Sequence, residues 1–223
     1  MIDWELGMKR HAQRILLSLG LTSGVSCAWA QSYSDVATQL GITHNYGSSS
    51  NAGGVSFFDF DQDGFDDLSF AGDYGHPCSF YRNTGNGFEL LTLHGVEQAA
   101  DAAKHVLWLD FDNDGDQDLY ITYFEATNRL YRNEGDLQFT DITQRAGLPQ
   151  DALTSLGASW VDYDRDGLLD LYILDRRVYG SNADAYNRLF KNTGDGRFTE
   201  QTQSAQVTDS AKYPFCSTFF DFD

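Results

Sequence analysis

Short apolar and aromatic runs, separated by glycine and aspartate, make up the chain after its first 30 residues. Four similar runs each end in acidic and aromatic residues: GVSFFDF, HVLWLDF, GASWVDY and CSTFFDF. Three further runs follow them closely: DDLSFAG, QDLYITY and LDLYILD. β-Branched and aromatic residues favour strands, whereas glycine and aspartate favour the breaks between strands. The pattern predicts an all-β protein, with no helical pattern after residue 30.

These strands recur at a period of about 50 residues. The acidic loops between the first and second runs begin at Asp59, Asp110, Asp162 and Asp221, which are 51, 52 and 59 residues apart. Each unit also contains an Asn-x-Gly hairpin signal, in FYRNTGNGF, LYRNEGDLQF and LFKNTGDGRF. Four short strands repeated at this period are typical of β-propeller blades. We therefore predict that residues 31–223 form a partial β-propeller of four-stranded blades, with about three blades and the start of a fourth.

One large side chain occupies the same position in each first run: Phe57, Trp108, Trp160 and Phe219. Such aromatics can stack on a sugar or another ligand. They can also fill the space between neighbouring blades. Because the position is equivalent in all the repeats, we expect these residues in the core between blades.

Three loops, at 59–67, 110–118 and 162–170, share one acidic spacing. Aspartates stand at positions one, three, five and nine, and a glycine at position six. The aspartates are Asp59, Asp61, Asp63 and Asp67; Asp110, Asp112, Asp114 and Asp118; and Asp162, Asp164, Asp166 and Asp170. Crowded carboxylates repel unless a cation neutralises them, and Ca²⁺ prefers several oxygen ligands. We therefore predict a Ca²⁺ site in each loop.

An ordinary turn and an EF-hand both fit these loops less well. An ordinary turn needs only one Asx residue, not four in a shared register. An EF-hand needs a glutamate at position twelve between two helices. That position holds Phe70, Ile121 and Ile173, each in a strand-like run.

Residues 1–30 are similar to a secretory signal peptide. The features are basic Lys9, Arg10 and Arg14, an apolar run over 15–25 and a small-residue cleavage site at Ala28-Trp29-Ala30. The apolar run is shorter than the roughly 20 residues of a membrane span. We expect a secreted, periplasmic or cell-surface protein with no membrane span.

The formal net charge of −18 argues against nucleic acid as a partner, because nucleic-acid binding needs a basic surface. An oxidising compartment would permit a disulfide between Cys78 and Cys216, but the sequence does not establish one. We treat both cysteines as unpaired.

The units DFDQDGFDDL, DFDNDGDQDL and DYDRDGLLDL, each followed by an R/K-N-x-G hairpin, resemble the FG-GAP/VCBS repeat family. In particular, they resemble the bacterial proteins similar to cartilage acidic protein. The resemblance covers residues 33–223, although the literal FG-GAP string is absent. It implies a calcium-stabilised, integrin-α-like β-propeller of usually seven blades that is exported and used for adhesion or binding, with the twelve loop aspartates as ligands.

We expect a non-catalytic adhesion or protein-interaction module that binds a protein or glycan ligand. The alternatives are a carbohydrate-binding, lectin-like propeller and the propeller part of a larger secreted hydrolase. The sequence gives little support to an enzyme, because the histidines have no ligand spacing and no nucleophile-base pairing stands out. These histidines are His44, His76, His94 and His105.

Two further expectations concern the third unit and the end of the chain. Arg176, Arg177, Tyr179 and Tyr186 form a basic and aromatic cluster in a long connection. Such residues are common at interfaces, although the segment can equally be a solvated loop. Asp221-Phe222-Asp223 matches the first three positions of a fourth acidic loop, so we expect the chain to be a fragment.

Overall fold

The computed structural model describes residues 33–48, 53–97, 101–176, 186–208 and 216–219. The chain divides into a short unit, Met1–Ser34, and a larger unit, Asp35–Asp223, that contains every described strand. The predicted signal peptide, Arg177, Tyr179 and the start of the fourth acidic loop lie outside the described residues.

The larger unit contains three four-stranded antiparallel sheets, each with its strands in sequence order. The first blade comprises β1 (Val55–Phe58), β2 (Asp67–Phe70), β3 (Ser79–Asn83) and β4 (Phe88–Leu91). The second comprises β5 (Ala102–Leu109), β6 (Asp118–Phe124), β7 (Arg129–Asn133) and β8 (Phe139–Asp141). The third comprises β9 (Thr154–Val161), β10 (Asp170–Arg176), β11 (Arg188–Asn192) and β12 (Phe198–Glu200).

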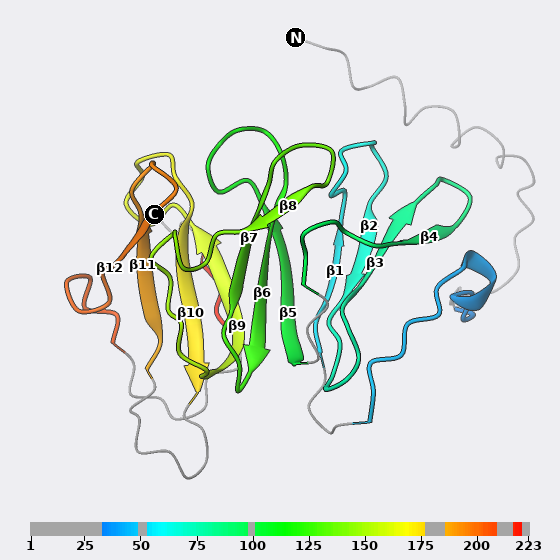
Figure 1. Cartoon of the computed structure of the whole chain (residues 1–223), viewed down its shortest axis with the longest axis horizontal. Helices are drawn as coiled ribbons and strands as arrows, with labels where there is room; N and C mark the ends of the chain where they lie inside the picture. The colour runs from blue at the N-terminus through cyan, green and yellow to red at the C-terminus, as the bar shows by residue number, and fades with distance from the viewer. Residues whose placement is uncertain (1–32, 49–52, 98–100, 177–185, 209–215, 220–223) are drawn as a thin grey trace, which may run out of the picture. The chain divides into compact units, whose positions relative to one another are not determined.

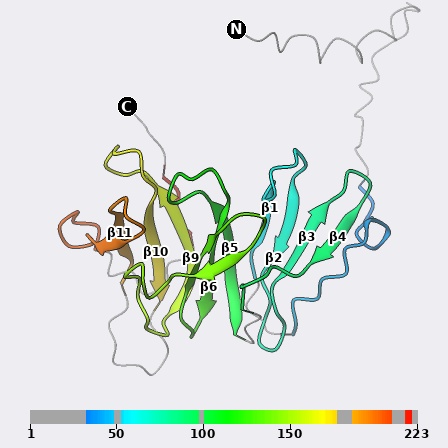
Figure 2. The same ribbon diagram turned by 45° about the horizontal axis from the view of Figure 1, so that its top comes forward.

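Figures 1 and 2 show the second blade between the first and the third. The prediction of an all-β propeller built from four-stranded blades is confirmed. The described residues contain one short helical element, the 3₁₀ turn η2 (Thr38–Leu40), and no helix long and apolar enough to cross a membrane. Cys78 and Cys216 are free thiols.

Aromatic side chains fill the space between neighbouring blades. Trp108 on β5 is 8% exposed and stacks on Phe60 of the first blade, with ring centroids 4.6 Å apart. Its indole N–H donates to Ser69 Oγ at 2.9 Å. At the next junction, the ring of Trp160 on β9 meets the edge of Tyr120, with centroids 5.4 Å apart. The prediction that Trp108 and Trp160 lie between blades is confirmed.

The same prediction is wrong for Phe57 on β1, which is 61% exposed. Phe219 is 43% exposed, but its ring packs against Tyr172 on β10 of the third blade, with centroids 5.6 Å apart, as Trp160 packs against Tyr120. Phe57 lies on the face of β1 that no sheet of the described residues covers, whereas Trp108 and Trp160 each have a preceding blade to pack against. Equivalent positions in a repeat are therefore buried only where a neighbouring blade is present.

Each acidic loop joins the first and second strands of its blade, and each Asn-x-Gly turn joins the third and fourth. In an antiparallel sheet with strands in sequence order, these two connections lie at the same end. A hydrogen bond between them, from Asn133 Nδ2 to the carbonyl of Gln117 at 3.1 Å, confirms this placement in the second blade. The acidic loops are thus supported by the hairpins of their own blades.

Candidate metal centres

Three of the four aspartates in each acidic loop converge. Within each set, carboxylate oxygens lie within 4.8 Å of one another. The triads come from positions one, three and nine: Asp59, Asp61 and Asp67; Asp110, Asp112 and Asp118; Asp162, Asp164 and Asp170. The position-five aspartates, Asp63, Asp114 and Asp166, lie outside these triads. Each blade therefore presents one cluster of three carboxylates at the same end of its sheet.

The loop backbone orients the position-one carboxylate. In the second loop, the N–H of Asp114 donates to Asp110 Oδ1 at 3.1 Å and the N–H of Gly115 donates to Asp110 Oδ2 at 3.0 Å. Gly115 has a φ of 94°, a conformation that strains residues with a Cβ. The other two loops repeat both bonds. The glycine at position six is thus required for the backbone turn that orients the first carboxylate.

The position-nine aspartate is buried and held between two segments. Asp118 is fully buried, and its two carboxylate oxygens accept from the N–H groups of Phe111 at 3.1 Å and Asn133 at 2.8 Å. Asp67 and Asp170 make equivalent pairs of bonds. The position-nine carboxylate is therefore held in place by the protein backbone in each triad.

Three supporting residues were missed in the sequence: Asn83, Asn133 and Asn192. Each donates its backbone N–H to the position-nine carboxylate and its side-chain amide to the position-eight carbonyl. The signal was present as the repeated R/K-N-x-G string, which we interpreted only as a hairpin turn. The asparagine stabilises the acidic loop as well as the turn.

Burial makes the position-nine carboxyl groups reluctant to ionise. It raises the pKa of Asp118 to about 7 and the pKa of Asp67 to about 6, and it raises the pKa of Asp170 in the same direction. Burial also raises the pKa of Asp61 and Asp112. A bound cation would reverse this penalty by favouring the ionised forms.

The donor set fits a hard divalent cation. All the triad atoms are carboxylate oxygens, which are the ligands that Ca²⁺ prefers. In the second loop, Asp112 Oδ1 is buried without a hydrogen-bond partner. A buried oxygen of this kind is costly unless something neutralises it, and a cation between the three carboxylates would do so.

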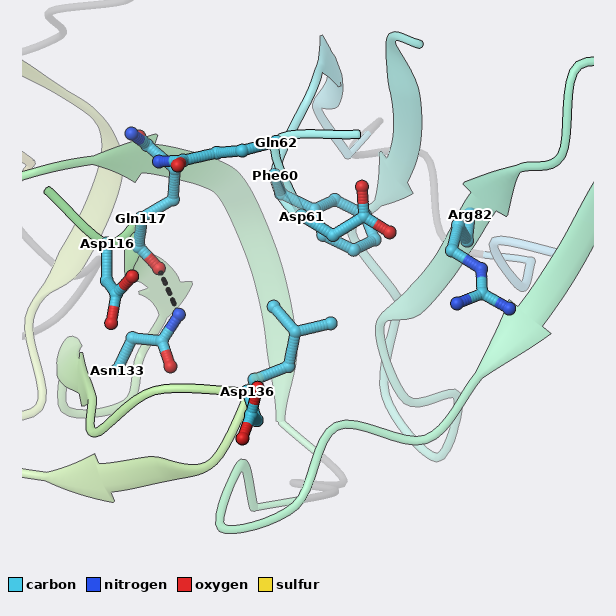
Figure 3. Close-up of a pocket in the computed structure, with 9 residues that line it drawn as sticks. Phe60, Asp61, Gln62, Arg82, Asp116, Gln117, Asn133 and Asp136 are labelled. Carbon is cyan, nitrogen blue, oxygen red and sulfur yellow. Dashed lines mark hydrogen bonds between the residues drawn. The ribbon is translucent and has the colours of Figure 1, made fainter. Parts of the chain in front are cut away.

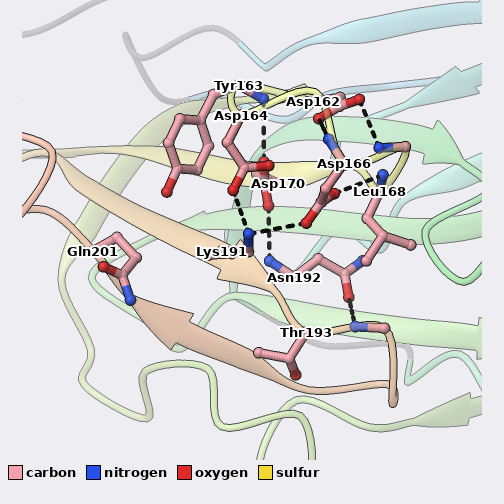
Figure 4. A network of polar contacts seen from close by, with 12 residues as sticks. Asp162, Tyr163, Asp164, Asp166, Leu168, Asp170, Lys191, Asn192, Thr193 and Gln201 are labelled. Carbon is pink, nitrogen blue, oxygen red and sulfur yellow. Dashed lines mark hydrogen bonds and ion pairs between the residues drawn. The ribbon is translucent and has the colours of Figure 1, made fainter.

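The third loop differs from the other two in its cationic neighbour. Lys191 forms an ion pair with Asp164, and its Nζ lies 2.9 Å from Asp166 (Figure 4). This contact lowers the pKa of Asp166. The equivalent arginines, Arg82 and Arg132, donate instead to glutamates of their own blades. In loop three, a bound cation would therefore have to displace Lys191 or share the carboxylates of Asp164 and Asp166 with it.

A surface hollow of about 350 Å³ adjoins the first triad. It is lined by Phe60, Asp61, Gln62, Arg82, Asp116, Gln117, Asn133, Asp136 and Leu137 (Figure 3). Its residues come from the acidic loop and β3 of the first blade and from the acidic loop and hairpin of the second. The edge of the first triad, at Asp61, is therefore open to this hollow.

The remaining sequence candidates lie away from the triads. Arg176 ends β10, at the opposite end of the sheet from the acidic loop, and Tyr186 precedes β11. His44 stacks on Phe70 and contacts Ser79 Oγ at 3.0 Å. Among the described residues, none of the triads includes a histidine.

Calcium-free protein is expected to lose stability as the pH rises from about 4 to about 7. The pKa of Asp118 is near 4 in the unfolded chain and about 7 in the fold, so the folded state binds more protons across this window. Thermal melting of calcium-free protein between pH 4.5 and 7.5 measures the effect. Asp118→Asn should make the melting temperature depend less on pH.

Asp116→Asn is the matched control, because it makes the same charge change in the same loop at a residue outside the triad. If both variants reduced the pH dependence of the melting temperature equally, general charge repulsion would explain that dependence. The position-nine carboxyl group would then have no special part in it.

Comparison with known proteins identifies the family. A family model for the FG-GAP-like repeat matches residues 59–121 and 110–173. Together the matches span residues 59–173, which is 115 of 223 residues and more than half of the chain. No curated protein sequence matches the chain. Each match begins at the first aspartate of one acidic loop and includes the next loop, so the matched units contain the triads. The chain belongs to the FG-GAP-like repeat family.

Proposed function

We propose that this chain is an exported, calcium-binding propeller module that binds a protein or glycan partner without catalysing a reaction. The observation that carries the proposal is the threefold repetition of one carboxylate triad, each held by the same backbone bonds. Ordinary surface acids are not expected to keep one geometry in three separate loops.

Calcium would be held by the residues of each loop in defined roles. The carboxylates of positions one, three and nine form the triad, and that of position five adds a further oxygen. Ca²⁺ supplies positive charge that neutralises the loop and permits its carboxylates to ionise. The ion is structural in this proposal.

Export follows from the proposed domain organisation, in which residues 1–30 are a signal peptide and residues 31–223 are the propeller region. The acidic balance of the chain accords with a partner other than nucleic acid.

The partner surface is proposed at the end of the blades opposite the triads, where the connections vary between repeats. The described residues beside the connection that follows β10, at the end of β10 and the start of β11, are fixed by buried polar contacts. Asp175 is buried and accepts from Arg188 Nε at 2.6 Å and from Ser155 Oγ at 2.6 Å. Variable loops on rigid scaffolds commonly carry recognition. Arg176, Arg177, Tyr179 and Tyr186 are the proposed contact residues.

Titration calorimetry with Ca²⁺ tests the metal sites. Three ions per chain are expected, and Asp112→Ala should reduce the number to two because it removes both oxygens of one triad side chain. Asp116→Ala, in the same loop, should leave three. Absence of calcium binding by the unaltered chain would refute the proposal.

A glycan array and a hydrolase panel test the rest of the proposal. Binding without turnover is expected, and turnover of any panel substrate would refute a non-catalytic role. For a ligand found in this way, Arg177→Ala with Tyr179→Ala should weaken binding while the melting temperature stays constant. Loss of binding on substitution of exposed residues near Asn133 or Asn192 instead would place the partner at the triad end.

A further inference from the structure

Neighbouring acidic loops are joined by a repeated hydrogen bond from position four. Gln62 Nε2 of the first loop donates to the carbonyl of Gly115 in the second at 2.6 Å. Asn113 Nδ2 of the second loop donates to the carbonyl of Gly167 in the third at 3.1 Å. Donor and acceptor positions are the same in both cases. Figure 3 shows Gln62 extending from the first blade toward Asp116 and Gln117 of the second.

The acceptor is the glycine on which the next triad depends. Gly115 donates its N–H to Asp110 Oδ2 at 3.0 Å, and Gly167 donates its N–H to Asp162 Oδ2 at 2.9 Å. The same glycine is therefore held on one side by the position-one carboxylate and on the other by an amide from the preceding blade. Removing that amide would loosen the turn that orients the carboxylate.

The donor is in turn oriented by its own loop. Gln62 and Asn113 have φ values of 60° and 58°, a left-handed conformation that costs energy for residues other than glycine. Each lies between two aspartates, at positions three and five. A cation that orders those aspartates would also fix the backbone from which the amide projects.

We propose that Gln62 and Asn113 are positioning residues that couple the cation sites of successive blades, so that calcium in one loop favours calcium in the next. This inference rests on the proposed calcium function. The coupling acts in both directions, because linkage between two binding equilibria is reciprocal. Loops one and two are coupled through Gln62, and loops two and three through Asn113.

Hydrogen exchange of the full chain, followed by mass spectrometry at increasing Ca²⁺, resolves the three loops separately. In Asn113→Ala, the calcium concentration for half-protection of loops 110–118 and 162–170 should rise on the order of fivefold, the effect of one hydrogen bond. Loop 59–67 should shift less, because it is linked to loop 162–170 only through loop 110–118. In Gln62→Ala, loops 59–67 and 110–118 should shift and loop 162–170 should shift less.

Each variant is thus the control for the other. Asn113→Gln should retain the coupling that Asn113→Ala loses, because it keeps a side-chain amide at position four, where the first loop has Gln62. Shifts confined to the substituted loop, or equal in all three loops, would overturn the coupling and leave calcium binding intact. If calcium protected no loop of the unaltered chain, the proposed function would fail and the coupling with it.

Discussion

Removal of calcium is expected to lower the melting temperature of this protein by roughly 15 °C or more. An ion that binds only the folded state contributes about 2.7 kcal/mol at 100 times its dissociation constant. Three sites of this strength would contribute about 8 kcal/mol, which is comparable to the whole stability of a typical domain. Differential scanning calorimetry with excess Ca²⁺ and with excess chelator measures the change.

The physical reason lies in the three triads. Without a cation, carboxylate oxygens of each triad lie within 4.8 Å of one another, and the position-nine member is buried. Asp112→Ala removes both oxygens of one triad side chain and should reduce the calcium response by about one third or more, because the loops on both sides are coupled to the lost site. Asp116→Ala should leave the response unchanged. Equal melting temperatures with calcium and with chelator would contradict a structural role for the ion.

Much of this site could be predicted because its information is local. The spacing of Asp110, Asp112 and Gly115 specifies a tight turn, in which the carboxylate of Asp110 accepts from N–H groups four and five residues further along the chain. The same locality explains why the four-stranded blades and their strand order followed from the repeat. Short connections between successive strands leave few alternative arrangements.

What could not be predicted depends on contacts between distant segments. Asp118 is anchored by the N–H of Asn133, a residue in another strand. Lys191 on β11 forms an ion pair with Asp164 in the acidic loop between β9 and β10, and this places a positive charge beside the carboxylates of the third loop. Gln62 donates to a glycine 53 residues away. Each of these pairings depends on side-chain direction and on blade packing, which a repeat pattern does not specify.

The exposure of Phe57 has the same origin. Its position is equivalent to that of Trp108, but burial depends on the neighbouring blade and not on the strand itself. This difference supplies a matched pair for measuring how much the contact between blades stabilises the fold.

Trp108→Ala is expected to destabilise the protein by about 3–5 kcal/mol, the usual cost of truncating a buried large aromatic residue. Trp108 is 8% exposed and packs on Phe60 and Phe80, with ring centroids 4.6 and 5.9 Å away. Phe57→Ala is the control and should change stability by no more than about 0.5 kcal/mol, because its side chain is 61% exposed. Urea unfolding at saturating Ca²⁺ measures both variants.

Trp108→Phe separates the two parts of this contact. It keeps an aromatic ring between the blades but removes the indole N–H that donates to Ser69 Oγ at 2.9 Å. The buried hydroxyl would lose its donor, and the smaller ring would leave space, so an intermediate loss of about 1–3 kcal/mol is expected. If Phe57→Ala were as costly as Trp108→Ala, the outer face of β1 would be covered in solution. Phe57 would then be as buried in solution as Trp108, contrary to the exposure described above.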